Sequence, residues 1–458
     1  MTDGPSEFKP GRRRGDDEGA KGKGAVLEQF VAELREAYTL LEDAQGTVFQ
    51  YMGTHWEEIS LATLRRLVWE IEHSTLTQSQ RAEVVDLLRV SVHVRDLQWG
   101  SVADNEVACR SGVLRLGGPK PVLRKHRPED YLESVIPHSY NPGAVCPTWD
   151  RFLAAAIGSD DEKYSALQDF FGYLLLPHAK LKTALVAYGA KPDTGKSVVV
   201  RVGQLLVGTP ACCSLPASQM DDPQQRAVLI GKRLNLMTEL PADAAIADGG
   251  FKALVSSEDP VLVNPKYKPP FMYTPRAKHI IATNNLPRVD DQTDAVFRRL
   301  LVIPFENQVP IERQDPALLD KLALELEGIF VWALEGAERL VRRHGVFTRV
   351  KRSDSILATM REEANPVAIF VRERLEPVEG KAIALRDVAA AFNQWNEGGK
   401  LSVRKVARSL RAMGLETDWW QLEGKACKAL VGYLFRPEQP APTGPDGPLE
   451  RRPEAPEP

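Results

Sequence analysis

The stretch "TALVAYGAKPDTGKSVVV", residues 183–200, decides the fold of this chain. Its apolar start, residues 183–188, predicts a β-strand, and the run that begins at Lys196 predicts a helix. Between them, Gly195, Lys196 and Ser197 form the ending of a phosphate-binding loop. In such a strand–loop–helix unit, backbone N–H groups and the helix dipole point at a phosphate. The stretch therefore predicts an α/β nucleotide-binding fold with a mostly parallel sheet.

The first glycine of this loop is displaced. The usual pattern has a glycine five residues before the Gly of Gly-Lys-Ser, where this chain has Ala190, and Gly189 comes one residue too early. Either Gly189 makes the turn off the strand, or Ala190 makes it with a negative φ. Pro192 and Asp193 favour a turn in both cases. The predicted nucleotide-binding residues are Gly189, Ala190, Asp193, Thr194, Gly195, Lys196 and Ser197.

Polar residues flank three further apolar strands, at residues 233–240, 277–285 and 298–305. Glu239 ends the first, and a carboxylate there can sit beside Mg²⁺ and orient an attacking water. Asn284 follows the second, where an amide can position that water without repelling the phosphate. Arg298 and Arg299 precede the third, and arginine suits the charge that builds on a γ-phosphoryl group. The alternatives are that Glu239 is only a surface acid, that Asn284 only marks a turn, and that the two arginines form salt bridges at a helix end.

Composition sets limits on the class of protein. The chain has 458 residues, is 43% hydrophobic, and carries a formal charge of −3. No apolar run is long enough to span a bilayer, and the polar N-terminus lacks a signal core, so we expect a cytoplasmic protein, in a bacterial host. The five cysteines form no Cys-x-x-Cys pair, so neither a zinc site nor a disulfide framework is expected. Contacts with nucleic acid have to be local, through a few cations.

The pattern along the chain predicts several domains. The expected boundaries are a disordered tail at 1–24, a helical and mixed α+β domain at 25–150, the ATPase domain at 151–345, a linker and winged helix at 346–436, and a Pro-rich disordered tail at 437–458. In the second of these, helical spacing links Val26, Phe30, Leu34, Tyr38 and Leu41. Residues 47–60 predict a hairpin with Gly53 in its turn. Residues 315–345 predict one long helical stretch.

The order of these motifs resembles the superfamily 3 helicases. The stretches "GAKPDTGKS", "LNLMTEL" and above all "ATNNLPR…AVFRRLLVIPF" carry the likeness. It is closest to the helicase part of phage, plasmid and poxvirus-type primase-helicases. The resemblance implies an AAA+-like ATPase core in which Lys196 and Ser197 bind ATP and Mg²⁺. It further implies Glu239 as the Walker B carboxylate and second Mg²⁺ contact, and Asn284 as the sensor. Arg298 is the first choice for an arginine finger and Arg299 the second.

The resemblance also implies contacts between subunits and with DNA. Relatives form hexameric rings and carry a hairpin that grips single-stranded DNA, here "VLVNPKYKPPF" at 261–271. Lys266 and Lys268 would contact phosphates, and Tyr267 would pack on a sugar or base. Lys252 matches a basic position that faces the nucleotide across the subunit boundary. The chain departs from relatives at "VSSED", where a Thr-Gly-Gly-Asp run is common.

Three functions remain open from the sequence. The preferred one is an ATP-driven DNA helicase in the replication of a phage, plasmid or integrated element, with 3′-to-5′ polarity implied by the resemblance alone. The first alternative is an ATP-regulated origin-binding initiator or regulator that does not unwind DNA. The second is a small-molecule kinase, which predicts a monomer. No Asp-x-Asp of a primase follows an apolar strand, so a primase or initiator partner would be a separate chain.

Overall fold

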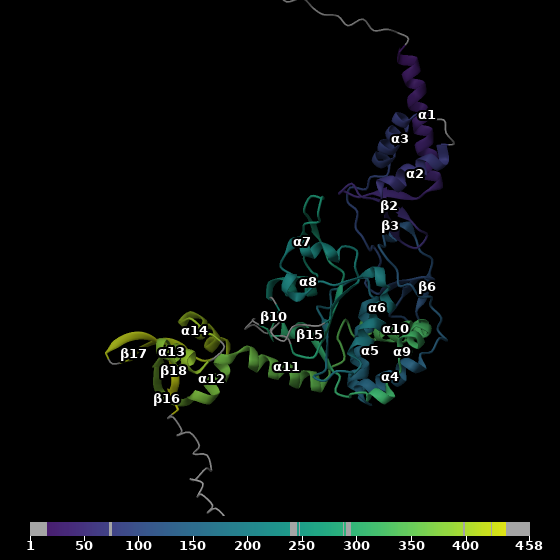
Figure 1. The fold of residues 1–458 in the computed structure, drawn as a ribbon. Coiled ribbons are helices and arrows are strands. Elements are labelled where there is room, and N and C mark those ends of the chain that lie inside the picture. Colours follow the sequence, from purple (N-terminus) through teal and green to yellow (C-terminus); the bar gives the residue numbers. More distant parts are fainter. Residues whose placement is uncertain are drawn as a thin grey trace, which may run out of the picture. The chain divides into compact units, whose positions relative to one another are not determined.

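The computed structural model describes residues 16–72, 76–238, 245–246, 248–286, 288–289, 295–396, 399–422 and 424–436, without the side chains of residues 16–23, 72, 245, 248, 288, 313 and 362–364. The chain divides into two compact units (Figure 1). The first ends at Leu357 and the second begins at Ala358, inside helix α11 (Lys351–Ala364). Each unit has an apolar core of its own.

The first unit begins with helices packed beside a small antiparallel sheet. The helices are α1 (Asp16–Ala37), α2 (Leu61–Glu72) and α3 (Gln78–Ser91), and the strands are β1 (Leu40–Glu42), β2 (Val48–Tyr51) and β3 (Trp56–Ile59). Leu34, Leu64 and Val84 join the helices in one buried cluster. Helix α1 starts at Asp16, so the expected disordered tail is too long by several residues.

Strand β1 replaces the last turn of the helix that the sequence spacing predicts. The helix ends at Ala37, and Leu41 pairs with Phe49 of β2. The backbone N–H of Glu42 donates to the carbonyl of Val92 at 2.9 Å. These long-range hydrogen bonds override a local helical pattern. The predicted hairpin at 47–60 is confirmed as β2 and β3, with Gly53 at φ 83° in the turn.

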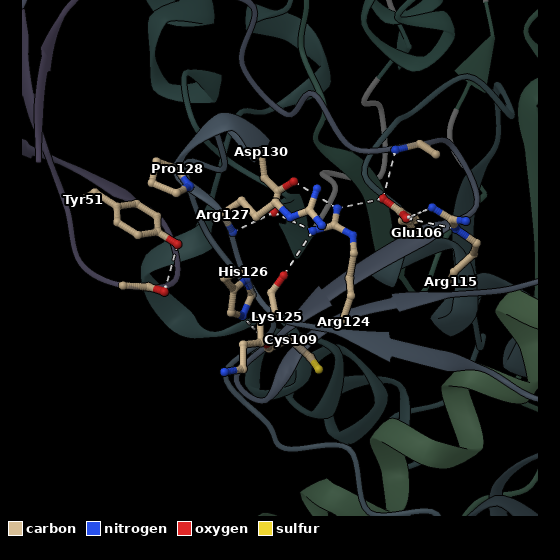
Figure 2. A network of polar contacts seen from close by, with 12 residues as sticks. Tyr51, Glu106, Cys109, Arg115, Arg124, Lys125, His126, Arg127, Pro128 and Asp130 are labelled. Carbon is tan, nitrogen blue, oxygen red and sulfur yellow. Dashed lines mark hydrogen bonds and ion pairs between the residues drawn. The ribbon is translucent and has the colours of Figure 1, made fainter.

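A second antiparallel sheet is held by an ion-pair network (Figure 2). Its strands are β4 (Glu106–Cys109), β5 (Gly112–Arg115) and β6 (Val122–Arg124), in the part of the chain for which the sequence predicts a helical and mixed α+β domain. Arg124 lies between two carboxylates, with Nη1 2.8 Å from Asp130 and Nη2 3.0 Å from Glu106. Arg115 binds the other oxygen of Glu106 at 3.1 Å. Burial alone would raise the pKa of the Glu106 carboxyl, but the hydrogen bonds from Arg124, Ala103 and Arg115 lower it overall.

The predicted parallel sheet forms the centre of the first unit. Within the described residues its order is β15-β7-β13-β9-β8, and every neighbouring pair is parallel. Its strands are β7 (Ala184–Tyr188), β8 (Cys212–Cys213), β9 (Leu234–Thr238), β13 (Lys278–Thr283) and β15 (Leu300–Pro304). Four of these are the apolar strands that the sequence predicts. The two-residue β8 is too short to show a pattern.

Helices pack against this sheet and bury its apolar side chains (Figure 1). They are α4 (Pro147–Ile157), α5 (Asp161–Leu175), α6 (Lys196–Val207), α9 (Leu318–Leu324) and α10 (Leu326–Arg342). Helices α5 and α10 approach so closely that a Cβ on Gly172 would lie 2.1 Å from the backbone nitrogen of Ala337. The long helix predicted at 315–345 begins only at Leu318 and is broken at Glu325. The Glu325 carboxylate instead accepts hydrogen bonds from the backbone nitrogens of Thr148 and Trp149, in the first turn of α4.

Shorter elements connect the strands of the sheet. They are α7 (Pro223–Arg226), α8 (Asp248–Ser256), β10 (Ala245–Ile246), β11 (Val261–Val263), β12 (Phe271–Tyr273) and β14 (Arg288–Val289). Strands β11 and β12 form an antiparallel hairpin over the stretch for which the resemblance implies one. Among the described residues, no helix is both long and apolar enough to cross a membrane.

The second unit joins helices to an antiparallel sheet of order β16-β18-β17. Its elements after α11 are α12 (Pro366–Arg374), β16 (Leu375–Ala384), α13 (Leu385–Trp395), α14 (Val403–Ala412), β17 (Thr417–Leu422) and β18 (Lys425–Phe435). Phe370, Phe392 and Leu410 lie in its core. Two helices followed by a hairpin is the order expected from the sequence, and strand β16 is an addition that the sequence did not predict.

Candidate nucleotide-binding site

The loop after β7 begins at Gly189, where neighbouring groups leave no room for a side chain. Gly189 is buried, whereas Ala190 is exposed. A Cβ at Gly189 would lie 2.7 Å from the carbonyl oxygen of Phe305, 2.8 Å from Thr194 Oγ1 and 2.9 Å from Lys196 Nζ. Carbon atoms do not approach oxygen or nitrogen so closely, so any larger residue here forces its neighbours to shift. The backbone bends from Ala190 onward, and neither Gly189 nor Ala190 has a positive φ, so the structure favours the alternative in which Ala190 takes the turn with a negative φ, while close contacts require the glycine at 189.

The rest of the loop also depends on special backbone geometry. Asp193 has φ 54° and Gly195 has φ 93°, both in the left-handed region. A Cβ on Gly195 would lie 2.9 Å from the ring of Phe152, which adds a steric reason for glycine. The Asp193 carbonyl accepts a hydrogen bond from the backbone N–H of Val309 at 3.0 Å. The loop is therefore fixed from α4 and from the segment after β15, before any phosphate is bound.

Lys196 is the first residue of α6, and its ammonium lies inside the loop. Nζ donates to the carbonyls of Gly189 at 2.9 Å and Lys191 at 3.0 Å, and to Thr194 Oγ1 at 3.0 Å. Burial lowers the pKa of this ammonium, and the charge of Asp193 acts in the opposite direction. Ser197 follows in the first turn of α6 and is exposed. This arrangement places a cation and a hydroxyl-bearing residue at the N-terminus of a 12-residue helix.

The strand ends bring a second predicted residue to the same edge of the sheet. Tyr188, the last residue of β7, pairs with Thr283 of β13 and with Pro304 of β15. The Gly189 N–H donates to the Thr283 carbonyl at 3.2 Å. Thr283 Oγ1 in turn accepts from the backbone N–H of Asn285 at 3.1 Å, which holds the following turn. Asn284, exposed in this turn, is next in sequence to the residue that binds the phosphate loop.

Glu239 lies outside the described residues, and so does the rest of the stretch 239–244. The preceding residue, Thr238, ends β9 and pairs with Ala282 of β13. Strand β9 therefore runs toward the same edge as β7 and β13. The assignment of Glu239 as a magnesium-binding carboxylate stays a prediction.

Arg298 and Arg299 lie at the opposite end of the sheet, where the parallel strands β7 and β15 begin. They end the short helix before β15, whose first residue, Leu300, pairs with Ala184 at the start of β7. At about 3.3 Å per residue, the length of β7 puts roughly 16 Å between this end and the phosphate loop. That separation exceeds the reach of an arginine side chain, so neither arginine serves the loop of its own chain.

The two arginines have different surroundings. Arg299 donates to Ser256 Oγ from Nε at 3.0 Å and from Nη2 at 2.7 Å, and to the Ala295 carbonyl at 2.6 Å. Arg298 is exposed and makes contacts of its own. Ser256 ends α8, one helical turn after Lys252. The structure thus brings Lys252 and the arginine pair onto neighbouring segments, both of which the resemblance assigns to the subunit boundary.

The hairpin of β11 and β12 carries the predicted DNA contacts. Tyr267 lies in its turn at φ 64° and is fully exposed, and Lys266 beside it is exposed as well. Lys268 differs, because its ammonium lies 3.5 Å from Glu58 and donates to Thr47 Oγ1 at 3.2 Å. Lys268 therefore ties the hairpin to strands β2 and β3, and a phosphate contact by Lys268 would compete with this pair.

Sequence reasoning missed the residues that support the loop from elsewhere. Phe152, Thr283 and Val309 all contact it, and they lie up to 116 positions away in the chain. No local pattern marks them, since each is an ordinary core or loop residue by composition. Only the order of the strands brings them together.

Three kinds of comparison relate the chain to known proteins. Residues 29–158 match the family described as D5 N terminal like, and residues 187–299 match a family of unknown function, DUF5906. Two solved structures of the NrS-1 C-terminal region are similar in fold at 13% sequence identity. One has a TM-score of 0.53 and covers 88% of this chain and 98% of that chain. The other has a TM-score of 0.52 and covers 89% and 99%.

A curated relative is an uncharacterized mitochondrial protein, ymf21, of Marchantia polymorpha. It is 32% identical over 88 residues, which are 19% of this chain and 48% of the relative. The chain thus spans about half the length of that relative. Its N-terminal part resembles D5-type proteins, and its overall chain path resembles the NrS-1 C-terminal region.

Proposed function

We propose that this chain is an ATP-driven DNA helicase of the superfamily 3 type, in the replication of a phage, plasmid or integrated element. The observation that carries the proposal is the phosphate loop itself, with Lys196 held inside a loop that starts at Gly189 and ends at the N-terminus of α6. The similarity of residues 29–158 to the D5 N-terminal family supports the same class. ATP and Mg²⁺ are the proposed cofactors.

In the proposed site, each residue has one task. Lys196 neutralises charge on the β- and γ-phosphates, and Ser197 contributes its hydroxyl to Mg²⁺. Glu239 orients the attacking water, and Asn284 holds that water in line with the γ-phosphate. The protein thereby stabilises charge where it develops during phosphoryl transfer, which is the main source of catalysis in such sites.

A second subunit completes the proposed site. Because Arg298 and Arg299 lie about 16 Å from their own loop, an arginine finger has to be offered to the loop of a neighbour. Arg298 suits this task better, since Arg299 is bound to Ser256 and the Ala295 carbonyl. This geometry is the reason for proposing a ring, and a homo-hexamer around single-stranded DNA is the expected assembly.

An initiator or regulator is the second candidate, and helix α14 favours it. Arg404, Lys405, Arg408 and Arg411 are exposed on this helix, and Trp419 on β17 is 64% exposed next to Lys428 on β18. Such a basic and aromatic surface can bind DNA without any unwinding. Strand displacement on a forked substrate separates the candidates, because an initiator binds the fork and releases no strand.

ATP hydrolysis with and without single-stranded DNA tests the proposal. We expect stimulation of the wild type by DNA and loss of turnover in Lys196→Ala. The matched control is Lys191→Ala, which removes an exposed lysine from the same loop and leaves the backbone carbonyl that Lys196 uses. Hydrolysis that is equal with and without DNA, by a monomer, would instead indicate a small-molecule kinase.

A further inference from the structure

A large cavity lies beside the hairpin of β11 and β12, away from the phosphate loop. Its volume is about 1460 Å³, and its walls come from β2 and β3, residues 95–104, residues 230–232 and the β12 segment up to Arg276. Small-molecule sites usually measure roughly 300–1,000 Å³. The cavity is therefore larger than a single nucleotide requires, and none of its walls belongs to residues 189–197.

The cavity walls carry an excess of positive charge. Among the described residues that line it, seven are lysine or arginine and five are aspartate or glutamate. Three of these carboxylates are already paired: Asp104 with Lys180 at 2.8 Å, Glu58 with Lys268 at 3.5 Å and Glu133 with Arg276 at 3.4 Å. Arg95 and Arg110 are exposed in the wall, and Lys232 is half-buried.

The excess is concentrated at the inner end of the cavity. A small adjoining pocket shares Glu133, Lys232 and Arg276 with it and adds Arg233 and Lys278. Arg233 is 9% exposed and Lys278 is 1% exposed. Glu133 is the one carboxylate among the described residues of this pocket.

The hydrogen bonds of this inner cluster leave N–H donors for a ligand. Lys278 Nζ donates to the Leu176 carbonyl at 2.5 Å and lies 5.4 Å from the ring of Tyr173, although an ammonium has three protons. Arg233 binds the hydroxyl and the carbonyl of Ser134. Burial, together with the charges of Arg233 and Arg276, lowers the pKa of Lys278 well below its ordinary value. Buried guanidinium groups cannot relieve such repulsion by losing a proton, so an anion stabilises the cluster.

We propose that the cavity binds the phosphate backbone of a nucleic-acid single strand and that Arg276 and Lys232 form its inner phosphate contacts. The exposed hairpin residue Lys266 lines the same cavity, so a strand held by the hairpin continues directly into it. Trp99 also lines it and offers a ring to a base, while its carbonyl accepts a hydrogen bond from Arg276. The inference rests on the proposed function, because it extends the DNA path from the hairpin toward the D5-like region.

Binding of a fluorescently labelled oligodeoxythymidine, measured by anisotropy over a series of salt concentrations, tests the site. The cavity variant is Arg95→Glu with Lys232→Glu, which leaves the buried cluster and the core intact. The control variant is Lys120→Glu with Arg151→Glu, which reverses two exposed charges outside the cavity. We expect the cavity variant to bind about tenfold more weakly or worse, and its plot of log K against log salt to be shallower by roughly 0.7 for each lost phosphate contact. The control should bind like the wild type.

Each other outcome overturns the inference in a distinguishable way. If the cavity and control variants bind the oligonucleotide equally well, the strand does not pass through the cavity, and the proposed helicase function stands. If free ATP displaces the oligonucleotide from the wild type but not from the cavity variant, the ligand is a mononucleotide. If the wild type binds no single strand at all, the proposed function falls together with the inference.

Discussion

The displaced glycine of the phosphate loop gives a sharp prediction for Gly189→Ala. The added methyl group would lie 2.7 Å from the Phe305 carbonyl, 2.8 Å from Thr194 Oγ1 and 2.9 Å from Lys196 Nζ. The first neighbour is backbone next to the sheet, and Thr194 is 1% exposed, so neither can move far. The ammonium of Lys196 is the group that gives way, and it loses its hydrogen bond to the Gly189 carbonyl.

The size of the effect follows from the cost of such overpacking, which is about 1–3 kcal/mol. If about 2 kcal/mol of this appears as lost ligand affinity, ATP binds roughly 30-fold more weakly. Titration calorimetry with a slowly hydrolysed ATP analogue and Mg²⁺ measures this directly. Ala190→Gly is the matched control, because Ala190 is exposed and the change restores the usual motif. The reasoning is refuted if Gly189→Ala binds like the wild type, or if Ala190→Gly is the variant that changes affinity.

Three further predictions concern stability and the hairpin. Gly172→Ala should lower the free energy of unfolding by about 1–3 kcal/mol or more, because the added Cβ meets the backbone of α10. The control Gly203→Ala, whose Cβ would have its nearest neighbour at 3.5 Å, should be neutral or stabilising by up to about 1 kcal/mol. Equal denaturant midpoints for the two variants would contradict this. The folded-state pKa of Glu106 is below its ordinary 4.5, so its contribution to stability is present above that pH and is lost as the pH falls through the lowered pKa. Acid should therefore destabilise the wild type more steeply than Glu106→Gln, and parallel pH profiles would count against the network. Tyr267→Ala should leave the melting temperature unchanged and weaken single-strand binding by about 1–3 kcal/mol, while Tyr267→Phe retains it; a melting shift would mean a structural role.

Much of the fold follows from local sequence patterns. The four long strands of the parallel sheet are short apolar runs bounded by turns, and such runs are buried whatever their neighbours are. The helices α4, α5, α13 and α14 likewise show their apolar spacing directly. Strand β1 could not be predicted, because residues 40–42 continue a helical pattern and become a strand only through pairing with β2. The break at Glu325 depends on the exposed start of α4, which is 177 positions away.

The candidate site also contains residues that the sequence could predict and residues that it could not. The residues from Gly189 to Ser197 are adjacent in sequence, and their chemistry could be predicted from the motif alone. The choice between Gly189 and Ala190 needed the backbone conformation of the turn, and the need for glycine at 189 depends on the positions of Phe305 and Thr194. The cations at the inner end of the cavity come from residues 232 and 233, just before β9, from residue 276 and from the start of β13, and no spacing in the sequence connects them. Their proximity depends on the order of the strands, which is a property of the folded sheet.

Mixing two inactive variants tests the central claim, that one chain's loop is completed by the next chain's arginine. Lys196→Ala removes the phosphate contact and keeps the arginine, while Arg298→Ala keeps the loop and removes the arginine. We expect each variant alone to lack DNA-stimulated ATP hydrolysis, and their mixture to regain a measurable part of it, because a Lys196→Ala subunit can offer Arg298 to an intact neighbouring loop. If the mixture stays as inactive as its components, or if Arg298→Ala alone hydrolyses ATP at the wild-type rate, the claim that two subunits share one ATP site is wrong.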